Sequence, residues 1–155
     1  MLDGAIVPPS EQPGKPRWVT SSPGKRSAAL FPQLTPLIGR EREVAVVCDL
    51  LARPNVRLLV LSGPGGVGKT RLSLQIATDL VDAFPDGVHV VPLAPISTAD
   101  LVLPTIAQVL GLGESADLPA IERLKDYLQD RHLLLLLDNF EQVITAAPLL
   151  AELLQ

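Results

Sequence analysis

Apolar residues repeat with a helical period in several stretches from residue 37 onward. From Glu41 to Arg53, valines and leucines recur every three or four positions and the stretch closes at Pro54, which predicts an amphipathic helix. The same pattern predicts helices over residues 69–83, 97–110, from about Asp117 or Pro119 to 128, and over 140–154. A capping-box-like Ser97-Thr98-Ala99-Asp100 opens the third helix. Pro104 and Pro148 are expected to kink or split the helices that contain them.

Three short apolar runs are typical of strands. They are Val56–Leu61, Val88–Leu93 and Leu133–Leu137, and turn residues or glycines flank them. A run that is apolar at every position indicates a strand covered on both faces, so we expect the Leu133–Leu137 strand to be fully buried. Strands that alternate with helices predict an α/β fold with a mostly parallel sheet.

Residues 1–36 differ from the rest of the chain. They contain seven of the 15 prolines and show neither helical nor strand periodicity. Their formal charge is +2, whereas the whole chain carries −4. This composition predicts a Pro-rich, disordered linker that precedes one folded domain over residues 37–155.

Composition excludes several classes of protein. The longest leucine run, Leu133–Leu137, is far shorter than the roughly 18–20 apolar residues of a membrane-spanning helix. The first residues lack the features of a signal peptide, and the single cysteine, Cys48, fits a reducing compartment. A net charge of −4 and only 3% aromatic residues argue against nucleic-acid binding. We therefore expect a cytoplasmic protein with no membrane contact and no DNA-binding element in this chain.

One glycine-rich segment points to phosphate binding. Gly63-Pro64-Gly65-Gly66-Val67-Gly68-Lys69-Thr70 matches the pattern G-x-x-x-x-G-K-[ST] at every position, and it lies between a predicted strand and a predicted helix. Glycines let successive backbone N–H groups surround an anion. Lys69 supplies a positive charge toward the outer phosphates, and the Thr70 hydroxyl can ligate Mg²⁺. We call Gly63–Thr70 the phosphate loop.

A second acidic position is expected at the end of a neighbouring strand. Asp138 directly follows the run Leu133–Leu137 and is therefore a candidate Mg²⁺ ligand. The next residue is Asn139, whose amide can orient a water molecule but cannot take its proton. Glu141 is the alternative candidate for a general base, and Lys69 and Asp138 complete the candidate catalytic set.

Three segments in order resemble a known family. LIGRERE at residues 37–43, LLVLSGPGGVGKTRL at 58–72 and LLLLLDNFEQV at 133–143 resemble the ATPase module of the STAND class. This class includes the NB-ARC and AP-ATPase regulators and the large bacterial LuxR-type transcriptional activators. The resemblance covers roughly residues 34–155.

The resemblance implies both a fold and a function. The fold is a P-loop NTPase three-layer sandwich, of which residues 37–155 form the N-terminal part of an NB-ARC/AAA-like domain. The implied ligands are ATP or ADP with Mg²⁺: Leu37, Ile38 and Arg40 lie near adenine, the phosphate loop and Arg71 hold phosphates, and Thr70 and Asp138 hold the metal. The implied role is a nucleotide switch in a bacterial transcriptional regulator.

Two departures from the family pattern qualify this picture. Asn139 stands where many relatives have a second acid, so we expect at most slow Mg²⁺-dependent ATP hydrolysis. The strand that follows the Asp138 strand in this class, and inserts beside the phosphate-loop strand, is not readable in the sequence. We therefore expect a sheet that is incomplete at its C-terminal end, marginal stability and nucleotide-dependent self-association.

Other readings remain open. Another P-loop ATPase or a small-molecule kinase would share the phosphate loop, although a kinase needs an arginine-bearing lid that is not evident. A GTPase is disfavoured because the chain contains neither N-K-x-D nor D-x-x-G. A truncated fragment without independent activity would also retain these motifs.

Overall fold

The computed structural model describes residues 37–113 and 117–155, so the linker predicted over residues 1–36 lies outside the described residues. In chain order the elements are α1 (Glu41–Leu51), α2 (Lys69–Asp79), η1 (Val81–Ala83), β1 (Val88–Pro92), η2 (Ala99–Leu101), α3 (Val102–Val109), α4 (Ala120–Leu128), β2 (Leu134–Asp138), η3 (Phe140–Ala146) and α5 (Ala147–Leu153), where η marks 3₁₀ turns. Within the two described ranges, no helix has the length and apolar character that a membrane crossing requires.

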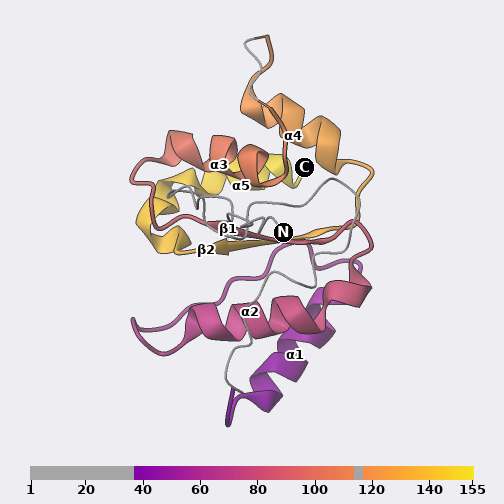
Figure 1. Ribbon diagram of the computed structural model, residues 1–155, viewed down its shortest axis with the longest axis vertical. Helices are drawn as coiled ribbons and strands as arrows, with labels where there is room; N and C mark the ends of the chain where they lie inside the picture. Colours follow the sequence, from indigo (N-terminus) through magenta and orange to yellow (C-terminus); the bar gives the residue numbers. More distant parts are fainter. Residues whose placement is uncertain (1–36, 114–116) are drawn as a thin grey trace, which may run out of the picture.

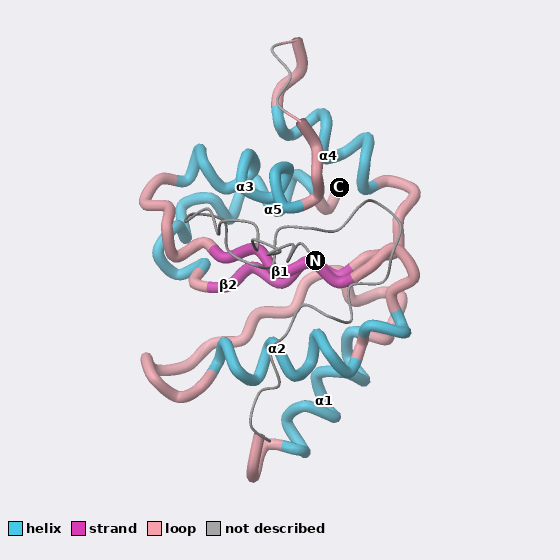
Figure 2. Tube along the Cα trace, in the orientation of Figure 1, coloured by secondary structure: helices cyan, strands magenta, loops and turns pink. Residues whose placement is uncertain are grey.

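The elements form three layers (Figure 1). Helices α1 and α2 lie on one side of the strand pair, and α3, α4 and α5 lie on the other; Figure 2 shows the strands between them. The strands β1 and β2 pair in parallel, with Val88 opposite Leu134 and Pro92 opposite Asp138. The predicted α/β fold with parallel pairing is confirmed.

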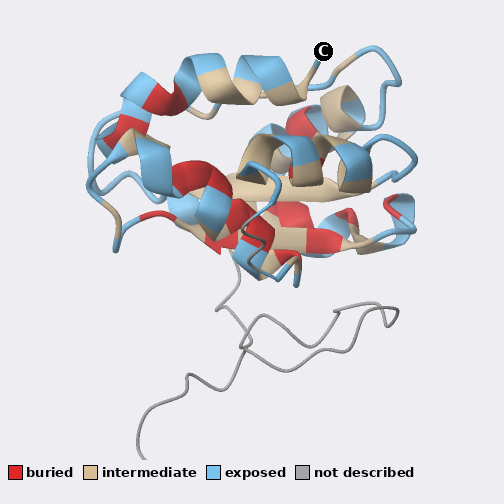
Figure 3. Ribbon diagram, turned by 90° about the horizontal axis from the view of Figure 1, so that it is seen from above, coloured by how far each residue is buried: buried red, intermediate tan, exposed pale blue. Residues whose placement is uncertain are grey.

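Each face of the strand pair contributes to its own hydrophobic core. Leu134 and Leu136 of β2 pack with the α1–α2 cluster, whereas Leu133, Leu135 and Leu137 pack with the α3–α5 cluster. The fully enclosed side chains of the second cluster are Val91, Leu93, Val102, Ile106, Leu124 and Val143. Figure 3 shows the buried positions gathered where helices meet strands. Successive strand residues point to opposite faces, so a continuous apolar run serves both cores.

Two strand predictions require correction. Residues 56–61 form no strand: neither β1 nor β2 supplies a hydrogen-bonded neighbour for them within the described part of the chain. Leu59 and Leu61 still pack partly into the α1–α2 cluster, while Leu58 and Val60 are 59% and 75% exposed. Strand β2 exists, but each of its residues is only half-buried. Among the described residues it pairs with β1, which covers one of its two edges. The prediction of full burial is therefore wrong.

The helices differ from the predictions at two places, whereas the expected splits at the two prolines are confirmed. Helix α2 ends at Asp79, and the remaining residues of the predicted helix form the 3₁₀ turn η1. The predicted capping box is wrong, because the Thr98 side chain makes no capping hydrogen bond. Pro104 and Pro148 lie in the first turns of α3 and α5, where a missing backbone N–H costs little. Each predicted helix is therefore divided into a 3₁₀ segment and an α-helix that begins shortly before the proline.

The starts of the two strands are joined by the turn at Asp86. Its carboxylate accepts a hydrogen bond of 2.8 Å from the His132 backbone N–H, and its backbone N–H donates to the His132 carbonyl at 3.2 Å. The Leu134 N–H donates to the Gly87 carbonyl at 3.0 Å. Arg131 lies 3.6 Å from the Asp86 carboxylate. These contacts fix the register of the pair at its N-terminal end.

Candidate functional site

The phosphate loop connects residues 56–62, which belong to no strand in the described part of the chain, to helix α2. Gly66 and Gly68 have φ of 78° and 87°, a left-handed conformation that glycine adopts without the cost of a Cβ. Gly68 is the residue before α2 and no side chain caps the helix. As in any α-helix, the first N–H groups of α2 have no acceptor within the helix, and the start of a helix can donate such groups to an anion.

The Lys69 side chain is held at the entrance of this loop. Its Nζ donates to the carbonyls of Gly63 and Pro64 at 2.9 and 3.0 Å. An ammonium group has three protons, so one donor remains for a ligand. Lys69 is thereby oriented before any ligand binds, which reduces the entropy that binding has to offset.

Thr70 and Asp138 meet although they come from different layers. The Thr70 hydroxyl donates to Oδ1 of Asp138 at 2.8 Å. Thr70 follows Lys69 in the first turn of α2, and Asp138 is the last residue of β2. The Leu93 backbone N–H donates to the Asp138 carbonyl at 3.0 Å, which fixes the end of β2 against β1. A hydroxyl and a carboxylate are oxygen ligands of the kind Mg²⁺ uses, and so this donor set fits the metal.

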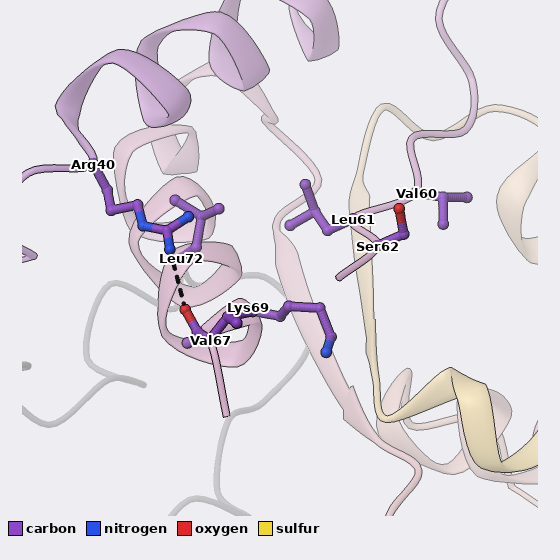
Figure 4. A pocket seen from close by; sticks show the side chains of 8 residues that line it. Arg40, Val60, Leu61, Ser62, Val67, Lys69 and Leu72 are labelled. Carbon is purple, nitrogen blue, oxygen red and sulfur yellow. Dashed lines mark hydrogen bonds between the residues drawn. The ribbon is translucent and has the colours of Figure 1, made fainter. Parts of the chain in front are cut away.

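The segment before α1 closes one side of the phosphate loop. Arg40 donates from Nη2 to the Val67 carbonyl at 3.4 Å, as the dashed line in Figure 4 shows, and pairs with Glu43 at 3.2 Å. A groove of about 620 Å³ lies here, lined by Leu37, Ile38, Arg40, Gly66, Val67, Gly68 and Arg71. The structure thus brings the predicted adenine-site residues next to the phosphate loop.

A smaller cavity of about 270 Å³ shares Arg40, Val67 and Gly68 with the groove. Its other lining residues are Val60, Leu61, Ser62, Lys69 and Leu72 (Figure 4). Sequence reasoning did not identify Val60, Ser62 or Leu72 as lining residues. In the sequence, the feature that could have indicated these residues is their closeness to the phosphate-loop motif.

Glu41 orders the chain that leads into α1. Its carboxylate accepts a hydrogen bond of 3.1 Å from the Gly39 N–H. Hydrogen bonds from the backbone of Glu41 itself and from Gly39 lower the pKa of this carboxyl below its usual range. A carboxylate at the first turn of a helix also interacts favourably with the helix dipole. Glu41 thereby helps hold the loop that carries Leu37 and Ile38.

Glu141 is not brought to the site in the same way. It is exposed on η3, and among the described residues no hydrogen bond or ion pair joins it to Thr70 or Asp138. Asn139, between Asp138 and η3, has φ 63° and ψ 31°. It is the one non-glycine residue with positive φ in the described ranges. A sequence signal existed, since asparagine tolerates this conformation better than most residues, but the prediction concerned only its lack of a carboxylate.

Comparison with known proteins identifies the family of the fold. Residues 36–155 match the family model described as the AAA ATPase domain. A protein of Mycobacterium tuberculosis (strain ATCC 25618 / H37Rv) named as an HTH-type transcriptional regulator is 40% identical over 99 residues, which cover 63% of this chain and 11% of that protein. Regulatory protein AfsR of Streptomyces coelicolor is 30% identical over 147 residues, which cover 84% of this chain and 15% of AfsR.

The chain therefore spans only a small part of these regulators. AfsR of Streptomyces griseus gives a similar result, with 29% identity over 159 residues covering 16% of its length. No solved structure matches the chain.

Proposed function

The chain belongs to the AAA ATPase domain family, and we propose that it binds ATP and ADP with Mg²⁺ as the switch module of a STAND-type regulator. The observation that carries this proposal is the contact between Thr70 and Asp138, 2.8 Å from Oγ1 to Oδ1, beside a phosphate loop whose lysine is already oriented. Two sequence motifs that are far apart in the chain converge there. That convergence is what a metal-nucleotide site requires.

Each part of the site has a defined task. The loop N–H groups and the start of α2 would bind the phosphates, with Lys69 contributing a charge-assisted hydrogen bond. Thr70 and Asp138 would hold Mg²⁺, which neutralises the phosphate charge when it is bound. Their own hydrogen bond gives the two oxygens the proximity that shared coordination needs.

The adenine end of the nucleotide is assigned to the groove before α1. Leu37 and Ile38 offer apolar surface, and Ile38 is 88% exposed, so a stacked base would bury area that is now in water. Arg40 links this groove to the phosphate loop through the Val67 carbonyl. A base in the groove and phosphates on the loop would thus contact one connected surface that includes Gly66, Gly68 and Arg71.

A switch role is supported by the acid that is missing beside Asp138. The Asn139 amide cannot accept a proton from water, and no hydrogen bond or ion pair joins Glu141 to Thr70 or Asp138 among the described residues. Slow hydrolysis keeps a nucleotide state long enough to act as a signal. The names of the relatives, regulatory protein AfsR and HTH-type transcriptional regulator, agree with a signalling role for the larger proteins in which such a domain occurs.

Ligand-dependent unfolding tests the proposal. Urea unfolding is measured without ligand, with MgADP, with MgATP and with MgGDP. A ligand that binds only the folded state at 100 times its Kd stabilises it by about 2.7 kcal/mol. We expect this stabilisation with both adenine nucleotides and less with MgGDP. A cooperatively folded chain whose unfolding midpoint does not respond to MgADP or MgATP contradicts the proposal.

A further inference from the structure

Asn139 occupies an unusual backbone conformation at the edge of the candidate Mg²⁺ site. Its φ of 63° and ψ of 31° lie in the left-handed region, which asparagine and glycine adopt most readily. Alanine is less favourable there, and β-branched residues are strongly disfavoured. The residue lies between the end of β2 and the start of η3. The chain therefore turns out of the strand within one residue of Asp138.

This turn connects three contacts that orient Asp138. On its N-terminal side, the Asp138 carbonyl accepts from the Leu93 N–H at 3.0 Å. On its C-terminal side, the Gln142 N–H donates to the Asn139 carbonyl at 3.2 Å, and Val143 is anchored in the core at 2% exposure. Between these anchors the Asp138 carboxylate accepts from Thr70. The left-handed residue is what allows all three contacts at once.

We propose that Asn139 is a positioning residue for Mg²⁺, which acts through its left-handed backbone and not through its amide group. The inference rests on the proposed function and deepens it. It also explains why residue 139 is not a glutamate. A glutamate there would have to adopt the left-handed backbone conformation, which its longer side chain disfavours. The identity of residue 139 thus follows from the geometry of Asp138.

The Mg²⁺ requirement of ADP binding tests this role. Asn139→Gly, Asn139→Asp, Asn139→Ala and Asn139→Val are titrated with MgCl₂ at fixed ADP, and ADP binding is measured separately in EDTA. We expect the Gly variant to keep the wild-type Mg²⁺ midpoint and the Asp variant to keep or lower it, since Asp tolerates the same backbone and adds a negative charge. The Val variant should raise the midpoint about 5- to 30-fold, with the Ala variant between Gly and Val. ADP binding in EDTA stays the same in all four, which a general loss of folding would not allow.

A matched control lies in the same turn. Gln142→Ala removes an exposed side chain while keeping the backbone N–H that bonds to Asn139, and we expect it to match the wild type. If Asn139→Gly raises the Mg²⁺ midpoint as much as Asn139→Val, the amide itself is required and the proposal is overturned. Equal midpoints in all variants overturn it as well.

A second measurement needs no nucleotide. Thr70→Val removes the hydroxyl that bonds to Asp138, and its effect on the melting temperature is compared in wild type, Asn139→Gly, Asn139→Ala and Asn139→Val. We expect Thr70→Val to lower the melting temperature in the wild-type and Gly backgrounds, less in Ala and least in Val. The same loss in every background contradicts the positioning role. A chain that binds no nucleotide but shows this coupling refutes the proposed function and supports only the part of the inference in which Asn139 positions the Asp138 carboxylate.

Discussion

The hydroxyl of Thr70 lies 2.8 Å from Oδ1 of Asp138, although the two residues are 68 positions apart in the sequence. One residue comes from the first turn of α2 and the other from the end of β2. Their contact brings the phosphate loop to the C-terminal end of a parallel strand, which is where open α/β sheets bind their ligands. The predictions below separate the contributions of these parts.

Lys69→Ala should weaken ADP and ATP binding by roughly ten- to a hundredfold, since a hydrogen bond to a charged group contributes about 1.5–3 kcal/mol. Calorimetric titration measures this loss. The matched control is Lys125→Ala, which removes the exposed lysine that pairs with Glu152 at 3.0 Å on the far helical layer. Equal affinities of the wild type and Lys69→Ala would refute the assignment of Lys69.

Asp138→Asn should remove most of the Mg²⁺ dependence of nucleotide binding while binding in EDTA persists. The neutral amide keeps the size of the side chain but lacks the charge that attracts a divalent cation. Titration of MgCl₂ at fixed ADP checks this expectation. Asp126→Asn, on exposed α4 surface, serves as the control. An unchanged Mg²⁺ midpoint in Asp138→Asn would assign the metal to other oxygens.

Ile38→Ala should weaken ATP binding by about tenfold without changing the melting temperature of the free protein. Its side chain is 88% exposed, so it contributes little to the fold but offers area for a base to cover. Ile144→Ala is the matched control, since this isoleucine is 61% exposed on η3. Competition for a labelled ATP analogue should favour ATP over GTP. Equal displacement by the two would contradict the adenine assignment.

Stability should fall between about pH 7 and pH 5.5, in part because of His89. Burial lowers the pKa of His89 below its usual value, opposed by a hydrogen bond with the Asp86 backbone. The Nε2 atom is buried without a hydrogen-bond partner in the described structure. The unfolded chain therefore binds a proton near pH 6.5, before the folded chain does, and protonation favours unfolding.

The stability contributed by neutral His89 is fully present above the unfolded pKa and is lost as the pH falls toward the folded one. Urea unfolding of wild type and His89→Gln at pH 7.5, 6.5 and 5.5 measures the difference. We expect a shallower decline in the variant. Parallel curves would contradict a role for His89 burial.

Self-association should decrease when residues 56–62, which have no strand partner among the described residues, carry charge. Leu58 and Val60 are 59% and 75% exposed there, and an unpaired extended edge is a template for another chain. Leu58→Lys with Val60→Lys should shift sedimentation toward monomer, measured with and without MgADP. Val46→Lys, on a residue of α1 that is also 59% exposed, should have little effect. An equal shift toward monomer in the Val46→Lys variant would mean that added positive charge, and not its place at residues 56–62, reduces self-association.

The sequence was most informative where the pattern of apolar residues directly reflects the surfaces against which an element packs. The helix from Glu41 was predictable because its periodic apolar face packs against α2, and the strand before Asp138 because its continuous apolar run packs against both cores. The phosphate loop was predictable because its glycines serve local backbone geometry, as the positive φ of Gly66 and Gly68 shows.

The errors arose where pairing or tertiary contacts decide the outcome. Val56–Leu61 has strand composition, but a strand also needs a hydrogen-bonded neighbour, which composition does not encode. Thr98 has the residue type of a helix cap, yet its side chain makes no such bond. The backbone of Asn139 was missed because one residue in a left-handed conformation leaves no periodic trace.

The strand pair is fastened at both ends, and this determines which part of the site can move. Asp86 bonds to His132 at the start of β2, and the Leu93 N–H bonds to Asp138 at its end. Sliding of β2 along β1 would break both sets of bonds together with the ladder between them. Helix α2 meets the strands through side-chain packing and the hydrogen bond from the Thr70 hydroxyl. For the proposed nucleotide switch, a change in the separation of Thr70 and Asp138 is therefore expected to displace the phosphate loop and α2, with Asp138 as the fixed point of reference.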